Sequence, residues 1–176
     1  WSLEVTPAIS APRLVDPGTG SGAIALALAH RRTDAQVEAV DASAEALVVA
    51  NENARRLSLS VRFTQGEWLA GCQGPYDLFV SNPPYVAEGD EHLPALRHEP
   101  LQALVAGADG LDDIRAIVEQ APRCLTSNGW LLLEHGWDQA AAVRELLLAA
   151  GFADVGSRRD LAGIERCTGG RWLERG

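Results

Sequence analysis

The sequence predicts an α/β fold in which helices cover both faces of a mostly parallel, seven-stranded sheet. The first observation is that short apolar stretches alternate along the chain with longer segments of helical composition, which is typical of parallel sheets. The second is that the last two apolar stretches, over residues 152–158 and 164–173, have no helix between them. We therefore expect these two to pair as a C-terminal hairpin that adds an antiparallel edge strand.

The first half of the chain begins with an irregular arm over residues 1–12, which contains two prolines and has no hydrophobic period. A single domain follows over residues 13–176. Its first strand is expected at 14–16 and is followed by a glycine-rich turn and an alanine-rich helix at 23–31. A second strand at 37–41 precedes a helix at 44–57, for which Ser43 is the expected N-cap.

The second half continues the alternation. Strands are expected at 61–64, 76–81 and 130–134, with helices at 112–125 and 139–150, the latter ending at Gly151. The polar segment that runs from residue 86 to about Leu111 is too long for a simple connection, so we expect it to be functional.

Composition and charge limit the classes of function. The chain has 176 residues, is 47% hydrophobic and 22% charged, and carries a net charge of −9. This suits one globular domain, and an acidic domain disfavours direct nucleic-acid binding. No apolar run approaches the ~18 residues of a membrane helix. Cys72, Cys124 and Cys167 form no CxxC pair, so we predict no disulfide framework and no metal site, and a cytoplasmic location.

The stretch Ser81-Asn82-Pro83-Pro84-Tyr85 ends the strand at 76–81 in a stiff turn. Neither proline has an N–H, and Pro83 pushes Asn82 into the extended region. The Asn82 amide oxygen and the Pro83 carbonyl can then accept two hydrogen bonds from one planar NH2 group. A rigid turn without chemistry is the alternative that these residues alone leave open.

The glycine-rich turn and Asp41 also follow strands. Gly18, Gly20 and Gly22 tolerate positive φ and let a ligand approach the backbone closely. The residues do not match the G-x-G-x-x-G pattern of dinucleotide enzymes, because Ala23 stands where the last glycine is required. Asp41 can hold a ribose diol or simply cap the next helix. Because ligands of parallel sheets bind beyond the carboxyl ends of strands, all three features point to one cleft.

The motifs together resemble those of the release factor glutamine methyltransferases, the HemK/PrmC family. The resemblance covers about residues 13–173. It rests on the segments Asp16-Pro17-Gly18-Thr19-Gly20-Ser21-Gly22, Asp41, Ser81-Asn82-Pro83-Pro84-Tyr85, Glu99-Pro100, Leu133-Glu134-His135-Gly136-Trp137-Asp138-Gln139 and Asp160-Leu161-Ala162-Gly163 with Arg166. It implies the Rossmann-like fold of class I methyltransferases that use S-adenosylmethionine (SAM).

The resemblance also implies a role for each site residue. The segment Gly18-Thr19-Gly20-Ser21-Gly22 would wrap the methionine part of SAM, and Asp16 and Asn82 are also expected among the cofactor-binding residues. Asp41 would hold the ribose, and Trp68 would lie by the adenine, although a core aromatic is the alternative for Trp68. In the acceptor turn, Asn82 and Pro83 would bind the target amide, Pro84 would stiffen the chain and Tyr85 would pack on the face of the amide. Glu99, Glu134 and His135 are expected to be structural. S-adenosylhomocysteine would be the product and a release factor the partner.

The sequence departs from the family pattern at its front. The family's helical recognition domain and its Pro-Arg-Pro-Glu-Thr-Glu segment do not precede the first strand here, so we expect a segment upstream of Trp1 to be missing. Pro17 replaces a usually bulky residue and removes a backbone donor. A second copy of the chain is one possible cover for the sheet edge or cleft that this leaves.

Two other functions stay open at this stage. An exocyclic amine of adenine or guanine offers the same planar NH2 group, so a nucleic-acid N-methyltransferase is the first alternative. A catalytically inactive binding module is the second.

Overall fold

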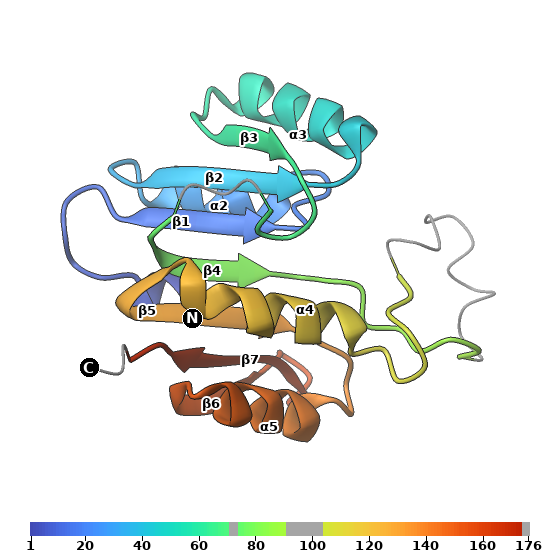
Figure 1. The fold of residues 1–176 in the computed structure, drawn as a ribbon. Helices are drawn as coiled ribbons and strands as arrows, with labels where there is room; N and C mark the ends of the chain where they lie inside the picture. The colour runs from blue at the N-terminus through green and yellow to red at the C-terminus, as the bar shows by residue number, and fades with distance from the viewer. Residues whose placement is uncertain (71–73, 91–103, 174–176) are drawn as a thin grey trace.

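The computed structural model describes residues 1–70, 74–90 and 104–173. Seven strands form one sheet in the order β3-β2-β1-β4-β5-β7-β6 (Figure 1). The strands are β1 (Arg13–Pro17), β2 (Gln36–Asp41), β3 (Arg62–Gln65), β4 (Tyr76–Ser81), β5 (Leu125–Glu134), β6 (Ala153–Arg159) and β7 (Glu165–Arg171). The helices are α1 (Ser2–Val5), α2 (Ala23–Arg31), α3 (Ala44–Leu57), α4 (Asp112–Gln120) and α5 (Ala140–Ala150), with a 3-10 helix η3 (Ala121–Arg123).

Helices cover both faces of the sheet, as predicted. Helices α4 and α5 pack on one face around Phe79 and Leu131 (Figure 1). On the other face, α2 packs over Leu14 and Leu78, and α3 lies against β2 and β3. Because parallel strands are buried on both faces, their central residues are almost wholly apolar.

Several elements have the expected bounds. Helices α2 and α3 and strand β4 begin and end where the sequence predicted. The Ser43 hydroxyl accepts a hydrogen bond from the Ala46 N–H at 3.1 Å, which confirms Ser43 as the N-cap of α3. Gly151 ends α5 in the left-handed conformation.

Two expectations about the helices were wrong in detail. Residues 1–12 are not wholly irregular, because Ser2–Val5 forms a helical turn and the Trp1 ring packs on Trp130 at 6.2 Å between centroids. The helix expected at 112–125 ends at Gln120, and Leu125 already belongs to β5. Pro122 has no N–H for a longer α-helix, so the chain tightens into η3 instead.

The antiparallel strand is also not at the edge. Strand β7 lies between β5 and β6 and is antiparallel to both, so the parallel β6 forms the edge. The hairpin itself is confirmed. Sequence adjacency predicts that two strands pair, but it does not say which of them also meets β5.

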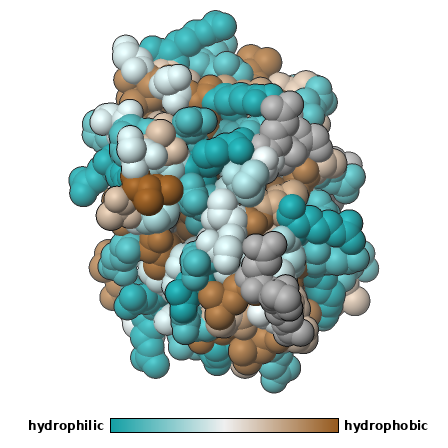
Figure 2. Space-filling model, turned by 60° about the vertical axis from the view of Figure 1, so that its left-hand side comes forward, coloured by the Kyte–Doolittle hydropathy of each residue, from teal (hydrophilic) through white to brown (hydrophobic). Residues whose placement is uncertain are grey.

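The surface at the amino ends of the parallel strands carries both hydrophobic and hydrophilic side chains (Figure 2). Figure 2 shows small hydrophobic areas separated by hydrophilic side chains on this side. Within the described ranges, no helix is both long and apolar enough to cross a membrane.

Candidate functional site

The glycine-rich turn between β1 and α2 has the conformation that its glycines allow. Gly18, Gly20 and Gly22 all have positive φ, at 73°, 54° and 85°. The Gly18 and Thr19 N–H groups donate to the Val40 carbonyl at 2.8 and 3.0 Å, which fastens the turn to β2. A Cβ atom on Gly20 would meet nothing within 4 Å, so the backbone is open to a ligand here. Ser21 lies exposed on the same turn.

Asp16 lies behind this turn and shapes it. Its side chain is buried, and Oδ2 accepts hydrogen bonds from Thr19 Oγ1 at 2.6 Å and from the Ala25 N–H at 3.0 Å. Its Oδ1 atom has no hydrogen-bond partner in the described part of the chain. Burial raises the pKa of the Asp16 carboxyl to about 7, although the bonds from Thr19 and Ala25 oppose this. Asp16 therefore supports the turn from inside.

Asp41 stands at the carboxyl end of β2, beside the turn. Its Oδ2 atom accepts from the Gly20 N–H at 2.8 Å and its Oδ1 atom from the Ser43 N–H at 2.9 Å. A carboxylate has about four acceptor positions, so about two remain for hydroxyl groups. The side chain is half-buried, and a diol placed over Gly20 can reach it.

Trp68 borders the same turn after β3. A Cβ atom on Gly18 would lie 3.0 Å from Cζ3 of its ring, which is closer than an ordinary van der Waals contact, so the indole lies directly against this glycine. The ring is partly buried and also packs against the core on the α4 side of the sheet. Trp68 thus forms a wall of the cleft while it remains part of the core.

The acceptor turn begins at Ser81, the last residue of β4. The Ser81 hydroxyl donates to the Pro17 carbonyl at 2.5 Å, which joins this turn directly to the start of the glycine-rich turn. The Asn82 side chain is exposed and has no hydrogen-bond partner in the described ranges, whereas Pro83 is buried. Pro84 and Tyr85 are half-buried. The structure therefore brings the predicted glycine turn, Asp41 and the acceptor turn to one edge, at the carboxyl ends of β1, β2 and β4.

A hollow of about 510 Å³ lies beside Tyr85. Its other lining residues are Glu134, Arg158, Arg159, Asp160, Arg166 and Cys167. Burial raises the pKa of Glu134, while the positive charge of Arg166 opposes this. The hollow mixes both signs of charge, which suits a polar peptide segment better than a uniformly anionic one.

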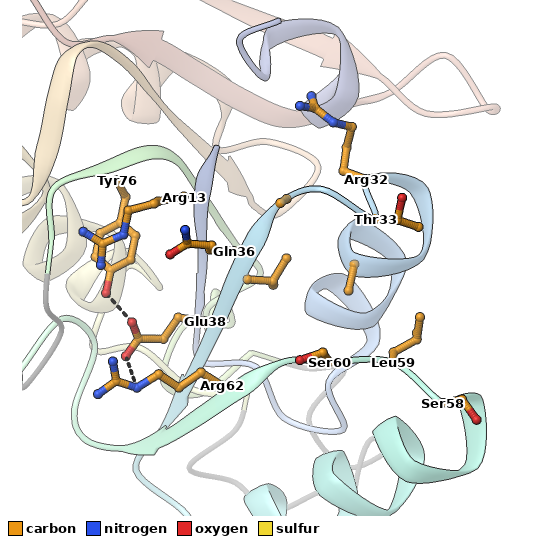
Figure 3. A pocket seen from close by; sticks show the side chains of 13 residues that line it. Arg13, Arg32, Thr33, Gln36, Glu38, Ser58, Leu59, Ser60, Arg62 and Tyr76 are labelled. Carbon is orange, nitrogen blue, oxygen red and sulfur yellow. Dashed lines mark hydrogen bonds and ion pairs between the residues drawn. The ribbon is translucent and has the colours of Figure 1, made fainter. Parts of the chain in front are cut away.

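A second hollow of about 550 Å³ lies at the opposite, amino-terminal ends of β1, β2 and β3 (Figure 3). There the Tyr76 hydroxyl donates to Glu38 at 2.6 Å, and Arg62 lies 3.9 Å from the same carboxylate. Ligands of open parallel sheets bind at the carboxyl ends of strands, so the site is assigned to the other edge despite the size of this hollow.

His135, at the end of β5, is structural, as expected. It is fully buried, with Nδ1 at 2.8 Å from the Gly136 carbonyl and Nε2 at 2.7 Å from Thr168 Oγ1. The carbonyl requires a donor at Nδ1, so Nε2 accepts from Thr168 in the neutral ring. Burial lowers the pKa of His135. Glu99 and Pro100 lie outside the described residues.

Sequence reasoning gave no role to two residues that hold the site together. Ser81 was expected only to end a strand, and Gln139 only to belong to a family motif. Gln139 bonds to Tyr85 across 54 positions of the sequence, and no local pattern predicts such a contact.

Comparisons with known proteins agree with this geometry. The family model of the methyltransferase small domain matches residues 3–110. Release factor glutamine methyltransferases from Bordetella pertussis and Pseudomonas aeruginosa are 52% and 53% identical, over 92% and 95% of this chain. The chain spans 61% and 62% of their lengths, about three fifths. These relatives bear out the resemblance found in the sequence and do not favour the nucleic-acid alternative.

Solved structures share the fold. A methyltransferase from Pyrococcus furiosus superposes with a TM-score of 0.72 at 18% identity, covering 94% of this chain and 77% of that one. A 16S rRNA N2 G1207 methyltransferase from T. thermophilus, solved with AdoMet and guanosine, gives 0.68 at 18% identity, covering 93% of this chain and 38% of that one. The seven-stranded sheet therefore has the same fold as these two methyltransferases.

Proposed function

Since this chain belongs to the methyltransferase small domain family, we propose that it transfers a methyl group from SAM to the side-chain amide nitrogen of a glutamine in a peptide chain release factor. The observation that carries the proposal is the hydrogen bond from Ser81 to the Pro17 carbonyl. It places an acceptor turn that suits a planar NH2 group directly against an open glycine turn. Relatives that are 52% and 53% identical to this chain are named for this activity.

The residues around the glycine turn fit SAM, which supplies a methyl group on a positively charged sulfur. The open backbone at Gly20 suits the methionine part, and the spare acceptor positions of Asp41 suit the two ribose hydroxyls. Trp68 offers a ring beside Gly18 for the adenine. Asp16 is buried, so we assign it a supporting role: it holds the conformation of the turn through Thr19 and Ala25.

The acceptor turn works by orientation. A carboxamide nitrogen is a weak nucleophile because its lone pair is delocalised into the carbonyl group. When Asn82 Oδ1 and the Pro83 carbonyl accept its two N–H bonds, the remaining lobe of the nitrogen faces the glycine turn. Pro84 stiffens this arrangement, and Tyr85 packs on the face of the amide. Because Asn82 is exposed, water can take the proton that the nitrogen loses after transfer, and no side-chain base is required.

The substrate that we propose is a protein, which binds in the hollow beside Tyr85. We also propose that the reaction takes place in the cytoplasm and that the chain does not bind nucleic acid directly. The test uses the 176-residue chain, SAM with a labelled methyl group, and a purified bacterial release factor. We expect label on one glutamine, located by mass spectrometry. RNA and DNA serve as parallel acceptors. Label on either nucleic acid, or on no acceptor, would contradict the proposal.

A further inference from the structure

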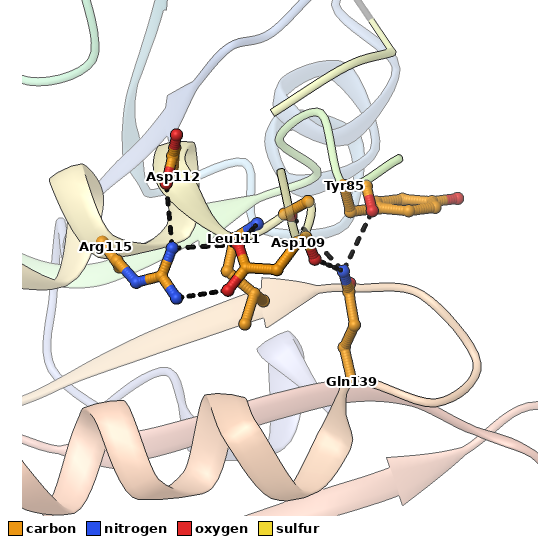
Figure 4. A network of polar contacts seen from close by, with 7 residues as sticks. Tyr85, Asp109, Leu111, Asp112, Arg115 and Gln139 are labelled. Atoms are coloured by element: carbon orange, nitrogen blue, oxygen red, sulfur yellow. Dashed lines mark hydrogen bonds and ion pairs between the residues drawn. The ribbon is translucent and has the colours of Figure 1, made fainter. Parts of the chain in front are cut away.

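Gln139, at the start of α5, uses both ends of its side-chain amide. Its Oε1 atom accepts from the Gly136 N–H at 2.8 Å. Its Nε2 atom donates to the carbonyls of Tyr85 at 3.0 Å and Asp109 at 3.1 Å, and the Gly110 carbonyl lies at 3.4 Å (Figure 4). One side chain thus ties together the acceptor turn, the turn before α4 and the segment between β5 and α5.

The backbone around Gln139 Nε2 is packed so closely that only glycine fits at position 110. Gly110 has a φ of 73°, and a Cβ atom there would overlap the Tyr85 carbonyl and lie 2.8 Å from Gln139 Nε2. The turn is also held from its far side, because Arg115 donates to Asp109 at 3.0 Å and to Asp112 at 2.8 Å (Figure 4). Those ion pairs are exposed and contribute little, whereas the bond from Gln139 to Tyr85 is partly buried.

The Tyr85 carbonyl is where the stiff part of the acceptor turn ends. Pro83 and Pro84 fix their own φ angles, so the chain up to Pro84 has little freedom. The φ angle of Tyr85 is not fixed in this way, because Tyr85 is not a proline. On its far side, Val86 pairs with the backbone of Leu104 and Ala106 at 2.8 and 3.0 Å. The peptide between Tyr85 and Val86 is therefore held in place by Gln139 together with this pairing.

We propose that Gln139 is a positioning residue for methyl transfer: it fixes the Tyr85 backbone and so aims the Tyr85 ring at the acceptor amide. This inference rests on the proposed function. Within the described residues, Gln139 has no hydrogen bond to the predicted cofactor residues, and its bond to the Tyr85 carbonyl is its link to the acceptor turn, so we expect it to act on methyl transfer through Tyr85. Small displacements of an orienting group lower turnover, while binding of the cofactor at the other turn is little affected.

The substitution Gln139→Glu separates the two ends of the amide. The introduced carboxylate has the same shape and still accepts from the Gly136 N–H, but it has no N–H for the carbonyls of Tyr85 and Asp109. We expect kcat for release factor methylation to fall by roughly ten- to a hundred-fold, with the KM for SAM changed by less than about three-fold. Gln36→Glu, the same change at the exposed amino end of β2, is the matched control and should leave kcat unchanged.

A comparison in the Tyr85→Ala background distinguishes positioning from a general effect on the fold. If Gln139 acts through the Tyr85 ring, Gln139→Glu has little further effect on kcat once that ring is gone. An equal loss of kcat in both backgrounds would overturn the proposal, as would unchanged kcat in the single variant. Thermal melts establish that each variant is folded at the assay temperature.

If Gln139→Glu melts too low for the assay, Gln139→Met replaces it, because this uncharged side chain has a similar length and likewise has no N–H for the Tyr85 carbonyl. An equal loss of kcat in both backgrounds, or an unchanged kcat in the single variant, would again overturn the proposal. Absence of methyl transfer by the unsubstituted chain would remove the proposed function and this inference together. Transfer by that chain, combined with losses that are equal in both backgrounds, would remove only the inference.

Discussion

Asp16 makes the stability of the unliganded chain depend on pH. Its carboxyl is 1% exposed and its pKa is raised from the ordinary 3.8 to about 7. Between these values the folded chain keeps a proton that the unfolded chain releases, so stability falls as the pH rises. The full shift corresponds to about 4 kcal/mol, because one unit of pKa is worth about 1.4 kcal/mol.

The substitution Asp16→Asn removes this dependence. The amide oxygen can still accept from Thr19 and from the Ala25 N–H, while the amide NH2 has no acceptor, which costs about 1–3 kcal/mol at every pH. The stability of the variant relative to the wild type should therefore rise by about 2 kcal/mol between about pH 5.5 and about pH 8. This range avoids the pI near 4.8, where the chain has little net charge.

Urea denaturation at several pH values, without ligand, measures the difference between the two proteins. Glu52→Gln, on the exposed face of α3, is the control and should show no such trend. A relative stability of Asp16→Asn that is flat with pH, or that falls as the pH rises, would refute the assignment of a buried, proton-binding carboxyl. Because Asn can keep both bonds to the turn, the affinity for SAM should change by less than about ten-fold. A complete loss of SAM binding would instead indicate direct contact.

Three further predictions concern the site and its support. Asn82→Ala should lower methyl transfer by orders of magnitude while calorimetry finds the affinity for SAM little changed, and normal turnover would exclude Asn82 from acceptor binding. Asp41→Ala should weaken SAM binding by roughly ten- to a hundred-fold, since hydrogen bonds from hydroxyls to a carboxylate are lost, and calorimetry with unaltered affinity would contradict the ribose role. Burial lowers the pKa of His135. As the pH falls below about 6.5, the unfolded chain therefore binds a proton that the folded chain does not bind, and the free energy of unfolding should fall. His135→Gln should reduce that loss in urea denaturation between about pH 7 and about pH 5.5, and a loss of equal size in the variant would show that other groups cause it.

Much of the site was accessible from local sequence. The positive φ angles at Gly18, Gly20 and Gly22, the cap at Ser43 and the stiff turn at Asn82 depend on a few neighbouring residues. Their chemistry is local, because it concerns which backbone angles a side chain allows and which donors it can satisfy. The alternation of strands and helices then places these features at one edge of the sheet.

The tertiary structure decided what depends on distant residues. It placed β7 inside the sheet, because β7 pairs with β5 as well as with β6. It buried the Asp16 carboxyl beneath the glycine-rich turn, and this burial is the main cause of its raised pKa. It brought Gln139 to the Tyr85 carbonyl, where a close approach of two backbones requires Gly110. By itself, the sequence determined the class of the fold and the chemistry of its turns, since both follow from short-range preferences. Strand order, burial and the support of the acceptor turn arise from contacts between segments far apart in the chain, and these exist only once it has folded.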